Sequence, residues 1–178
     1  EKVFTPAPFV SFRSSRNLKS HLVRSKVYPL ERVVGSAKCK SSGCKVCLNI
    51  KETDNFKDNQ KGEEYKINHH LTCSDKCLVY LLTCKVCLKK YVGQTIGEFR
   101  FRWNNYKDNY RIAEGGEAHM QSYLFDHFKT EGHTGFLHDV EISLIDKTDP
   151  SKPLEREQFW IRKLNTLVPN GLNVSESV

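Results

Sequence analysis

The stretch VYLLTCKVCLKKYVG, residues 79–93, does most to decide the fold. Two apolar runs of strand length flank the pair Cys84-x-x-Cys87, and each run carries a tyrosine, Tyr80 or Tyr91. Two such runs joined by a short turn predict a β-hairpin, and a Cys-x-x-Cys pair is typical of half a zinc site. The stretch therefore predicts a hairpin with metal ligands in its turn and tyrosines on its arms. The plainer alternative is free hairpin cysteines beside ordinary strand aromatics.

An aromatic stripe follows the hairpin. Phe99, Trp103, Tyr106 and Tyr110 recur at helical spacing, which predicts an amphipathic helix over about residues 97–110. The residues TIGE at 95–98 have the capping-box pattern that begins helices.

The remaining pattern completes the predicted fold. It predicts a helix at about 117–131, a strand at 139–145 and a helix at about 153–165. The order of elements is then strand, strand, helix, helix, strand, helix. The predicted fold class is α+β: a small three-stranded antiparallel sheet flanked by helices, preceded by an N-terminal basic arm and a zinc-binding annex.

We expect three parts along the 178 residues: a basic arm over 1–38, a cysteine-rich linker over 39–77 and the α+β domain over 78–178. In the linker, the polar span before Cys73 predicts loop and a short strand at 64–67. Because the sequence begins at Glu1 rather than Met, we expect it to be part of a longer polypeptide. No run of 18 apolar residues is present, so no membrane span is predicted.

The positive charge lies almost wholly in the arm. Residues 1–40 hold nine Lys or Arg and two acids, whereas the remaining 138 residues hold nineteen of each. A basic arm with interleaved aromatics favours contact with nucleic acid; the alternative is a solvated tail. The candidate contacts are Arg13, Arg16, Lys19, Arg24 and Lys26.

Seven cysteines and two Cys-x-x-Cys pairs favour metal sites in a reducing compartment over a disulfide framework. Upstream, Cys39-x4-Cys44-x2-Cys47 offers three thiolates to a structural Zn²⁺. Cys73 is the preferred fourth ligand. The competing choices are Cys77, His69 and His70.

Two charged helix residues have both a plain and a functional interpretation. Glu157 falls on the apolar stripe of the last predicted helix, with Leu154, Ile161 and Leu164. It either leans into water at the edge of the stripe or points into a site and holds a divalent cation. Arg102, beside the aromatic stripe, is either a solvated arginine or a guanidinium clamp on phosphate.

Taken together, these signals resemble the GIY-YIG endonuclease family. The resemblance covers about residues 78–174 and rests on LVYLLT, on KYVG, on an arginine nine residues beyond Gly93, and on EREQFWIRKLNTLVPNGLN. It implies a catalytic Mg²⁺ or Mn²⁺ on the glutamate and hydrolysis of a DNA phosphodiester. The residues that it implies for the site are Tyr80, Tyr91, Arg102, Tyr106, His119, Glu157 and Asn173.

Three positions depart from that family. Leu78 stands where glycine is usual, and Tyr106 stands where many members have histidine, as in the bacterial excision-repair branch. The third departure is the cysteine pair between the tyrosine motifs. With the upstream cysteines it resembles the endonuclease of Penelope-like retroelements over about residues 9–174.

The retroelement resemblance implies a biological setting. A nick in DNA would supply the primer end for target-primed reverse transcription. A reverse transcriptase domain would belong to the same longer chain and would bring RNA as a partner. The protein would be made in the cytoplasm and act in the nucleus, with no membrane partner.

A second zinc site follows from spacing. His127-x5-His133 is a half-site that fits Cys84-x2-Cys87, so a second structural Zn²⁺ would tie the hairpin turn to the end of the second helix.

Two other functions remain open from the sequence. One is a non-catalytic zinc module that binds nucleic acid. The other is a cross-brace zinc module of the ubiquitin system, whose eight ligands would be Cys39, Cys44, Cys47, His70, Cys73, Cys77, Cys84 and Cys87.

Overall fold

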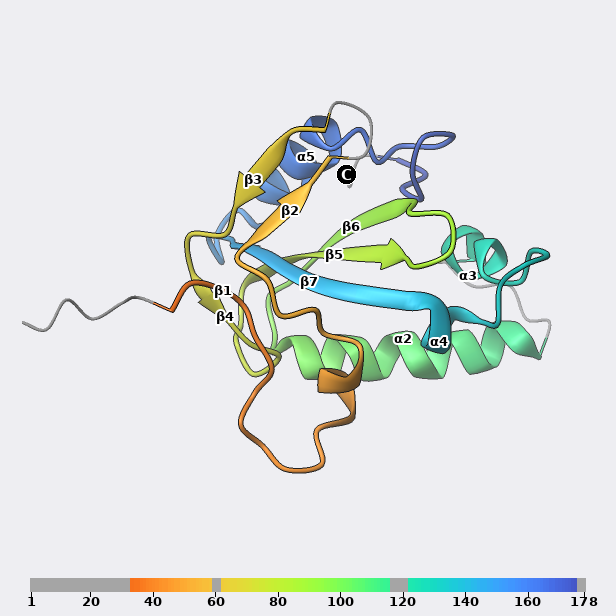
Figure 1. Cartoon of the computed structure of the whole chain (residues 1–178), viewed down its shortest axis with the longest axis horizontal. Helices are drawn as coiled ribbons and strands as arrows, with labels where there is room; N and C mark the ends of the chain where they lie inside the picture. The colour runs from red at the N-terminus through yellow and green to blue at the C-terminus, as the bar shows by residue number, and fades with distance from the viewer. Residues whose placement is uncertain (1–32, 59–61, 116–121, 176–178) are drawn as a thin grey trace, which may run out of the picture. The chain divides into compact units, whose positions relative to one another are not determined.

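A three-stranded antiparallel sheet lies at the centre of the structure, a computed structural model (Figure 1). Its strands are β5 (Leu78–Cys84), β6 (Lys90–Thr95) and β7 (Val140–Lys147), in the order β6-β5-β7. All of β5 except Thr83 is buried. A central strand covered on both faces has no polar alternation, which explains its continuous apolar sequence.

The structure describes residues 33–58, 62–115 and 122–175. Val33–Val178 forms one compact unit. The five basic candidates of the arm and His119 lie outside the described residues. Within the described residues, no helix is long and apolar enough to cross a membrane.

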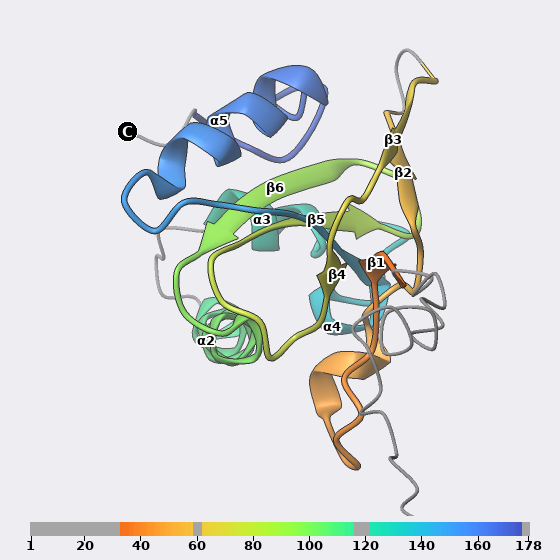
Figure 2. The same cartoon turned by 90° about the vertical axis from the view of Figure 1, so that its left-hand side faces the viewer.

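Four helices accompany the sheet in the described residues: α2 (Phe99–Glu114), α3 (Ser122–His127), α4 (Phe136–Asp139) and α5 (Pro153–Lys163). Figures 1 and 2 both show α2 and α5 on opposite sides of the sheet. The predicted α+β fold class and order of elements are confirmed, with the short α4 as an addition. Helix α2 runs four residues beyond its predicted end, whereas the second helix ends at His127 rather than near 131.

The aromatic stripe of α2 builds the core on its side of the sheet. Phe99, Trp103 and Tyr106 are at most 1% exposed. The rings of Trp103 and Tyr106 contact Phe136 of α4 at centroid distances of 5.5 and 5.9 Å. Phe136 thus packs the short α4 against the aromatic stripe of α2.

The expected capping box of α2 is not formed. Glu98 occupies the N-cap position without a side-chain hydrogen bond. The first amides of the helix instead donate to backbone carbonyls of the upstream turn: Phe99 N to Asp75 O at 3.2 Å and Arg100 N to Cys73 O at 2.9 Å. A helix start needs acceptors for its free N–H groups, and here a distant loop supplies them.

The linker is more structured than the sequence predicts. It forms η1 (Lys45–Leu48), an antiparallel hairpin of β2 (Asn55–Lys57) and β3 (Glu64–Lys66), and a parallel pair of β1 (Gly35–Ser36) and β4 (His70–Leu71). Of these, only the strand near residues 64–67 is predicted. The hairpin packs Phe56 and Tyr65 against Trp160 of α5, with ring centroids 5.1 and 5.6 Å apart.

Candidate active site and metal sites

Gly93 makes room for a tyrosine of the neighbouring strand. The register of β5 and β6 places Tyr80 opposite Gly93. A Cβ at Gly93 would lie 2.6 Å from the Tyr80 hydroxyl and 2.7 Å from Cζ of the ring. Only glycine therefore lets the Tyr80 ring cross β6, which gives a physical reason for the KYVG motif.

The Tyr80 hydroxyl meets two side chains from α2. It lies 2.9 Å from the Tyr106 hydroxyl, and Arg102 Nε donates to it at 3.2 Å. The Arg102 guanidinium also lies over the Tyr106 ring, 5.0 Å from its centroid. Residues four apart share one helix face, so α2 presents Arg102 and Tyr106 together.

Tyr91 joins this group from β6. It lies opposite Leu82 rather than Tyr80. The two tyrosines are therefore diagonal neighbours and not a directly facing pair, and alternation along β6 places Tyr91 on the same face as Gly93. Tyr106 also lies close enough to Tyr91 to lower its pKa. Tyr106 is thus a neighbour of both tyrosines of the hairpin.

Glu157 of α5 points inward. Its side chain is 5% exposed, and Trp160 and Ile161 of the same helix are also buried. Its carboxylate is close enough to Tyr80 and Tyr91 to raise the pKa of each. Glu155, two residues earlier, is exposed and pairs with Lys152 at 2.9 Å. The structure thus brings Glu157, and not Glu155, to the tyrosines.

Burial keeps the tyrosines of this cluster protonated. Loss of water contact is the largest cause that raises the pKa of Tyr80, Tyr91 and Tyr106, while the Arg102 charge opposes the rise in all three. At neutral pH the three hydroxyls are therefore neutral hydrogen-bond donors and acceptors around a fixed guanidinium.

Asn173 serves the backbone of the site. Its Oδ1 accepts from Val92 N, and its Nδ2 donates to Val92 O, both at 2.9 Å. The side-chain amide thus bonds both backbone groups of Val92, as a neighbouring strand would, and fixes β6 between Tyr91 and Gly93. The structure therefore places Asn173 beside the tyrosine strand as a clamp rather than against the hydroxyls.

Two pairs of metal-ligand type meet at the hairpin turn. One ligand atom from each of Cys84, Cys87, His127 and His133 falls within 4.8 Å of the others. The Thr130 hydroxyl lies 3.1 Å from His133 Nδ1, whereas the buried Nε2 of His133 has no hydrogen-bond partner in the described residues. Burial also lowers the pKa of His127, which favours the neutral imidazole that binds metal. The site fits a tetrahedral ion such as zinc.

The upstream cluster brings together Cys39, Cys44, Cys47 and Cys73. Two of its sulfur pairs are separated by 3.6 Å (Cys44–Cys73) and 3.5 Å (Cys39–Cys47). Sulfurs bound to one zinc at about 2.3 Å lie roughly 3.8 Å apart. A backbone hydrogen bond at Ser41 lowers the pKa of Cys39 to about 7, whereas burial raises that of Cys47 to about 11. Four thiols in this arrangement fit one metal ion.

The competing fourth ligands lie elsewhere. Cys77 Sγ faces the Ile96 carbonyl at 3.6 Å, and His69 and His70 are exposed outside the cluster. Because Cys84 and Cys87 meet two downstream histidines, the eight ligands of the cross-brace interpretation are not grouped as that interpretation requires.

Asp139 supports the hairpin site and is not predicted from the sequence. Its carboxylate accepts from the Thr134 hydroxyl at 2.7 Å and from Gly135 N at 3.1 Å, and these bonds hold the loop that follows His133. Gly135 has φ of +127°. An Asp four residues after a glycine is too common a pattern to identify such a role.

Comparisons with known proteins give two solved structures. No protein-family model matches the chain, and no curated protein matches it. The catalytic domain of the intron endonuclease I-TevI, in a glutamate-to-alanine mutant, is 26% identical, covers 56% of this chain and 94% of its own, and has a TM-score of 0.44. The catalytic domain of the homing endonuclease I-TevI is also 26% identical, covers 56% of this chain and 99% of its own, and has a TM-score of 0.45.

Proposed function

We propose that this protein is a metal-dependent DNA endonuclease that hydrolyses a phosphodiester bond and leaves a nick. The observation that carries the proposal is the meeting of Tyr80, Tyr91, Tyr106 and Arg102 on one face of the sheet with the buried Glu157 nearby. The motif resemblance to GIY-YIG endonucleases involves the same side chains. A non-catalytic module would have no need to bury a carboxylate close to two buried tyrosine hydroxyls, one of which holds a guanidinium.

Each residue has a task in such a reaction. Arg102 would offset the charge that develops on the phosphate, because its guanidinium stays protonated and Tyr80 holds its Nε. Tyr80 or Tyr91 would orient the attacking water through its hydroxyl, and the small ionised fraction of that tyrosine would accept the proton of the water, leaving a neutral tyrosine. Asn173 and Gly93 would keep the strand and the Tyr80 ring in place.

Glu157 is the residue that would hold the catalytic Mg²⁺ or Mn²⁺. A buried carboxylate oxygen fits the preference of these ions for oxygen ligands. When bound, the ion would supply Lewis-acid polarisation of the phosphate and stabilise the leaving oxygen.

Two structural Zn²⁺ ions are proposed for the cysteine clusters, one on Cys39, Cys44, Cys47 and Cys73 and the other on Cys84, Cys87, His127 and His133. The second would hold the hairpin turn, and therefore the two strands that carry Tyr80 and Tyr91, against the segment after α3. Metal removal should lower the free energy of unfolding, because such sites contribute directly to folding.

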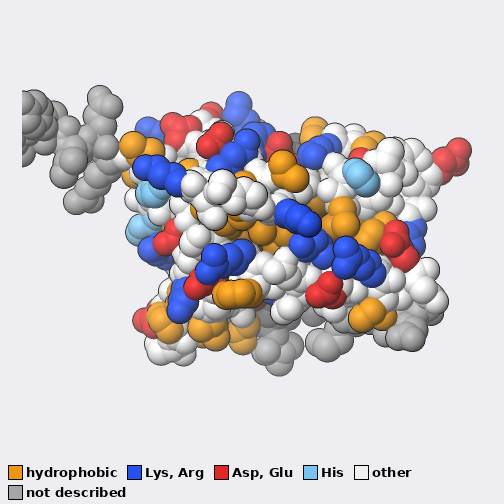
Figure 3. Space-filling model, turned by 90° about the horizontal axis from the view of Figure 1, so that it is seen from below, with side chains coloured by type: hydrophobic (Ala, Val, Ile, Leu, Met, Phe, Trp, Pro, Cys, Tyr) orange, Lys and Arg blue, Asp and Glu red, His pale blue; other side chains and the backbone are white. Residues whose placement is uncertain are grey.

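The finer biological role is also a proposal. In a Penelope-like retroelement, the nick would leave a 3′ end from which a reverse transcriptase in the same polypeptide extends in the nucleus, with RNA as template. The support is the position of the cysteine pair between the tyrosine motifs. Lys and Arg side chains gather across the middle of the face that Figure 3 shows, which agrees with a polyanion partner.

A plasmid assay tests the proposed function. Supercoiled plasmid incubated with the protein and Mg²⁺ should yield open circles, and the reaction should stop without added divalent ion. Arg102→Ala should reduce the rate by about 10²-fold, a value typical of removing one preorganised electrostatic group. Arg100→Ala is the control, because Arg100 is exposed on α2 and lies over Phe101 rather than in the tyrosine cluster. Plasmid that stays supercoiled with the zinc-loaded protein would overturn the proposal.

A further inference from the structure

Asp146 of β7 is a buried carboxylate with no part in the candidate site described above. Its side chain is held at both oxygens: Oδ1 accepts a hydrogen bond from Lys147 N at 2.8 Å. Its Oδ2 accepts from Trp160 Nε1 at 2.9 Å and pairs with Arg156 Nε at 2.8 Å. Arg156 and Trp160 lie on α5, one residue before and three residues after Glu157. Asp146 therefore ties the sheet to α5 on either side of the proposed metal ligand.

A register shift in β7 turns Asp146 toward α5. Tyr80 pairs with Leu144, whereas its neighbour Val79 pairs with Asp146, so Ile145 is an extra residue in β7 at this point. Because paired residues share a face and neighbours alternate, Asp146 lies on the face of Val79 and not on that of Tyr80. Without the extra residue, it would lie on the tyrosine face. A β-bulge re-aims side chains in this way.

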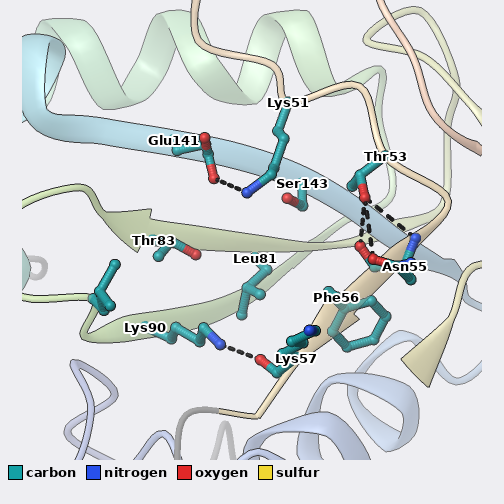
Figure 4. Close-up of a pocket in the computed structure, with 11 residues that line it drawn as sticks. Lys51, Thr53, Asn55, Phe56, Lys57, Leu81, Thr83, Lys90, Glu141 and Ser143 are labelled. Carbon is teal, nitrogen blue, oxygen red and sulfur yellow. Dashed lines mark hydrogen bonds and ion pairs between the residues drawn. The ribbon is translucent and has the colours of Figure 1, made fainter. Parts of the chain in front are cut away.

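The face that Asp146 reaches is the one that the β2–β3 hairpin covers. Leu81 and Ser143 form the next pair of residues on this face, and Figure 4 shows them beside Phe56 of β2. The Phe56 ring contacts Trp160 at a centroid distance of 5.1 Å. Trp160 thus packs its ring on the hairpin and directs its N–H to Asp146.

The two parts of the candidate site come from elements on opposite sides of the sheet. Tyr80 meets side chains of α2, whereas Glu157 belongs to α5, and Figures 1 and 2 show these helices on opposite sides. The position of the Glu157 carboxylate relative to the tyrosine hydroxyls therefore depends on how α5 is rotated and placed against the sheet. Charge-assisted hydrogen bonds fix geometry well, and those of Asp146 act on the turn that contains Glu157.

We propose that Asp146 is a positioning residue for Glu157. By holding Arg156 and Trp160, it fixes the turn of α5 that carries the Glu157 carboxylate, and so the affinity of that carboxylate for its divalent ion. The inference rests on the proposed function, in which Glu157 holds Mg²⁺ or Mn²⁺. Asp146 acts through the helix and not by contact with the ion or with DNA. Groups that orient a metal ligand change metal affinity by about 10–100-fold when they are removed.

Mn²⁺ binding to the zinc-loaded protein without DNA tests the inference without cleavage, with paramagnetic broadening of the Glu157 amide signal as the measurement. Asp146→Asn leaves at least one of three donors without an acceptor, because an amide has a single oxygen. It should raise the Mn²⁺ concentration at half broadening by about tenfold. Arg156→Met should raise it as well. If charge alone mattered, the two variants would shift it in opposite directions, since one removes a negative and the other a positive charge.

Ile142→Val is the matched control. Ile142 is buried in the same strand, and its substitution removes one methyl group while the Asp146 bonds remain. Its Mn²⁺ midpoint should equal that of the parent. Equal midpoints in the parent and Asp146→Asn, or tighter binding in Arg156→Met, would overturn the inference and leave the proposed function standing. No broadening at Glu157 in the parent would overturn the metal site and the inference together.

Plasmid nicking gives a second measurement. Asp146→Asn should need about tenfold more Mg²⁺ for its half-maximal rate and should approach the parental rate at saturating Mg²⁺, whereas loss of folded protein would lower the rate at every concentration. Because Asp146 acts through Glu157, Asp146→Asn combined with Glu157→Gln should cleave no more slowly than Glu157→Gln alone. A further loss in the double variant would overturn the inference. A parent that binds Mn²⁺ but does not nick would overturn the proposed function, and the Mn²⁺ midpoints would still decide the role of Asp146.

Discussion

At the scale of single residues, Gly93 is required because the Tyr80 ring occupies the space that a side chain at position 93 would need. A methyl group at this position would lie 2.6 Å from the Tyr80 hydroxyl, and a buried ring held by Tyr106 and Arg102 has no free space to enter. Gly93→Ala should therefore lower the free energy of unfolding by about 1–3 kcal/mol, the usual cost of overpacking a core.

Gly97→Ala is the matched control for this experiment, because Gly97 is exposed and, apart from its two chain neighbours, no described residue has an atom within 4 Å of the added Cβ. Chemical denaturation of both variants gives the measurement. Equal stability of Gly93→Ala and Gly97→Ala would show that the Tyr80 ring does not need the glycine.

The protonated tyrosines predict how cleavage depends on pH. Burial raises the pKa of Tyr80 and Tyr91 above about 10. Below that pKa, the fraction ionised rises tenfold per pH unit. If a tyrosine accepts the proton of water, the single-turnover rate should rise with pH between 6 and 9 and reach no plateau. A rate that levels off near pH 7 would indicate a different base, one with a pKa near 7, such as a histidine.

At the scale of elements, α2 depends on the upstream cysteine cluster. The amides of Phe99 and Arg100 donate to the carbonyls of Asp75 and Cys73, and Cys73 belongs to that cluster. Metal bound there should fix these carbonyls and, through them, the first turn of the helix that carries Arg102.

Hydrogen exchange measures this dependence. Cys39→Ser should speed exchange at Phe99 and Arg100 by roughly tenfold or more, because the loop that accepts their hydrogen bonds becomes loose. The amide of Leu164, which donates to Trp160 O at the end of α5, is the internal reference. Unchanged protection of the Phe99 and Arg100 amides in the variant would show that the first turn of α2 does not depend on the cysteine cluster.

The elements also show which parts of the structure a sequence can predict. The stripe of Phe99, Trp103 and Tyr106 and the apolar run of β5 produce local periodicities, so their helix and strand are predictable. The spacing within each cysteine or histidine pair is equally local. The β2–β3 hairpin is not predictable, because its polar sequence is held by rings that meet Trp160 far along the chain. The clamp of Asn173 on Val92 spans 81 residues and has no local pattern.

At the scale of the whole molecule, charge is divided unequally along the chain. The excess of seven positive charges lies within residues 1–40, most of which precede the described residues. Deletion of residues 1–30 should weaken binding to DNA and reduce the slope of log K against log[salt], because fewer counterions are released. Salt titrations of the two proteins provide the comparison; equal slopes would exclude the arm from the interface. Cleavage at saturating DNA should persist without the arm.

The central claim is that Glu157 holds the ion that assists cleavage, and its substitution is the most direct test. Glu157→Gln keeps the size of a side chain that is 5% exposed and removes its charge. The single-turnover rate with Mg²⁺ should fall by at least about 10²-fold, while DNA affinity without metal stays equal or rises slightly. Glu155→Gln, on the exposed side of α5, should cleave like the parent. Parental rates in both variants, or loss of cleavage in Glu155→Gln alone, would contradict the account.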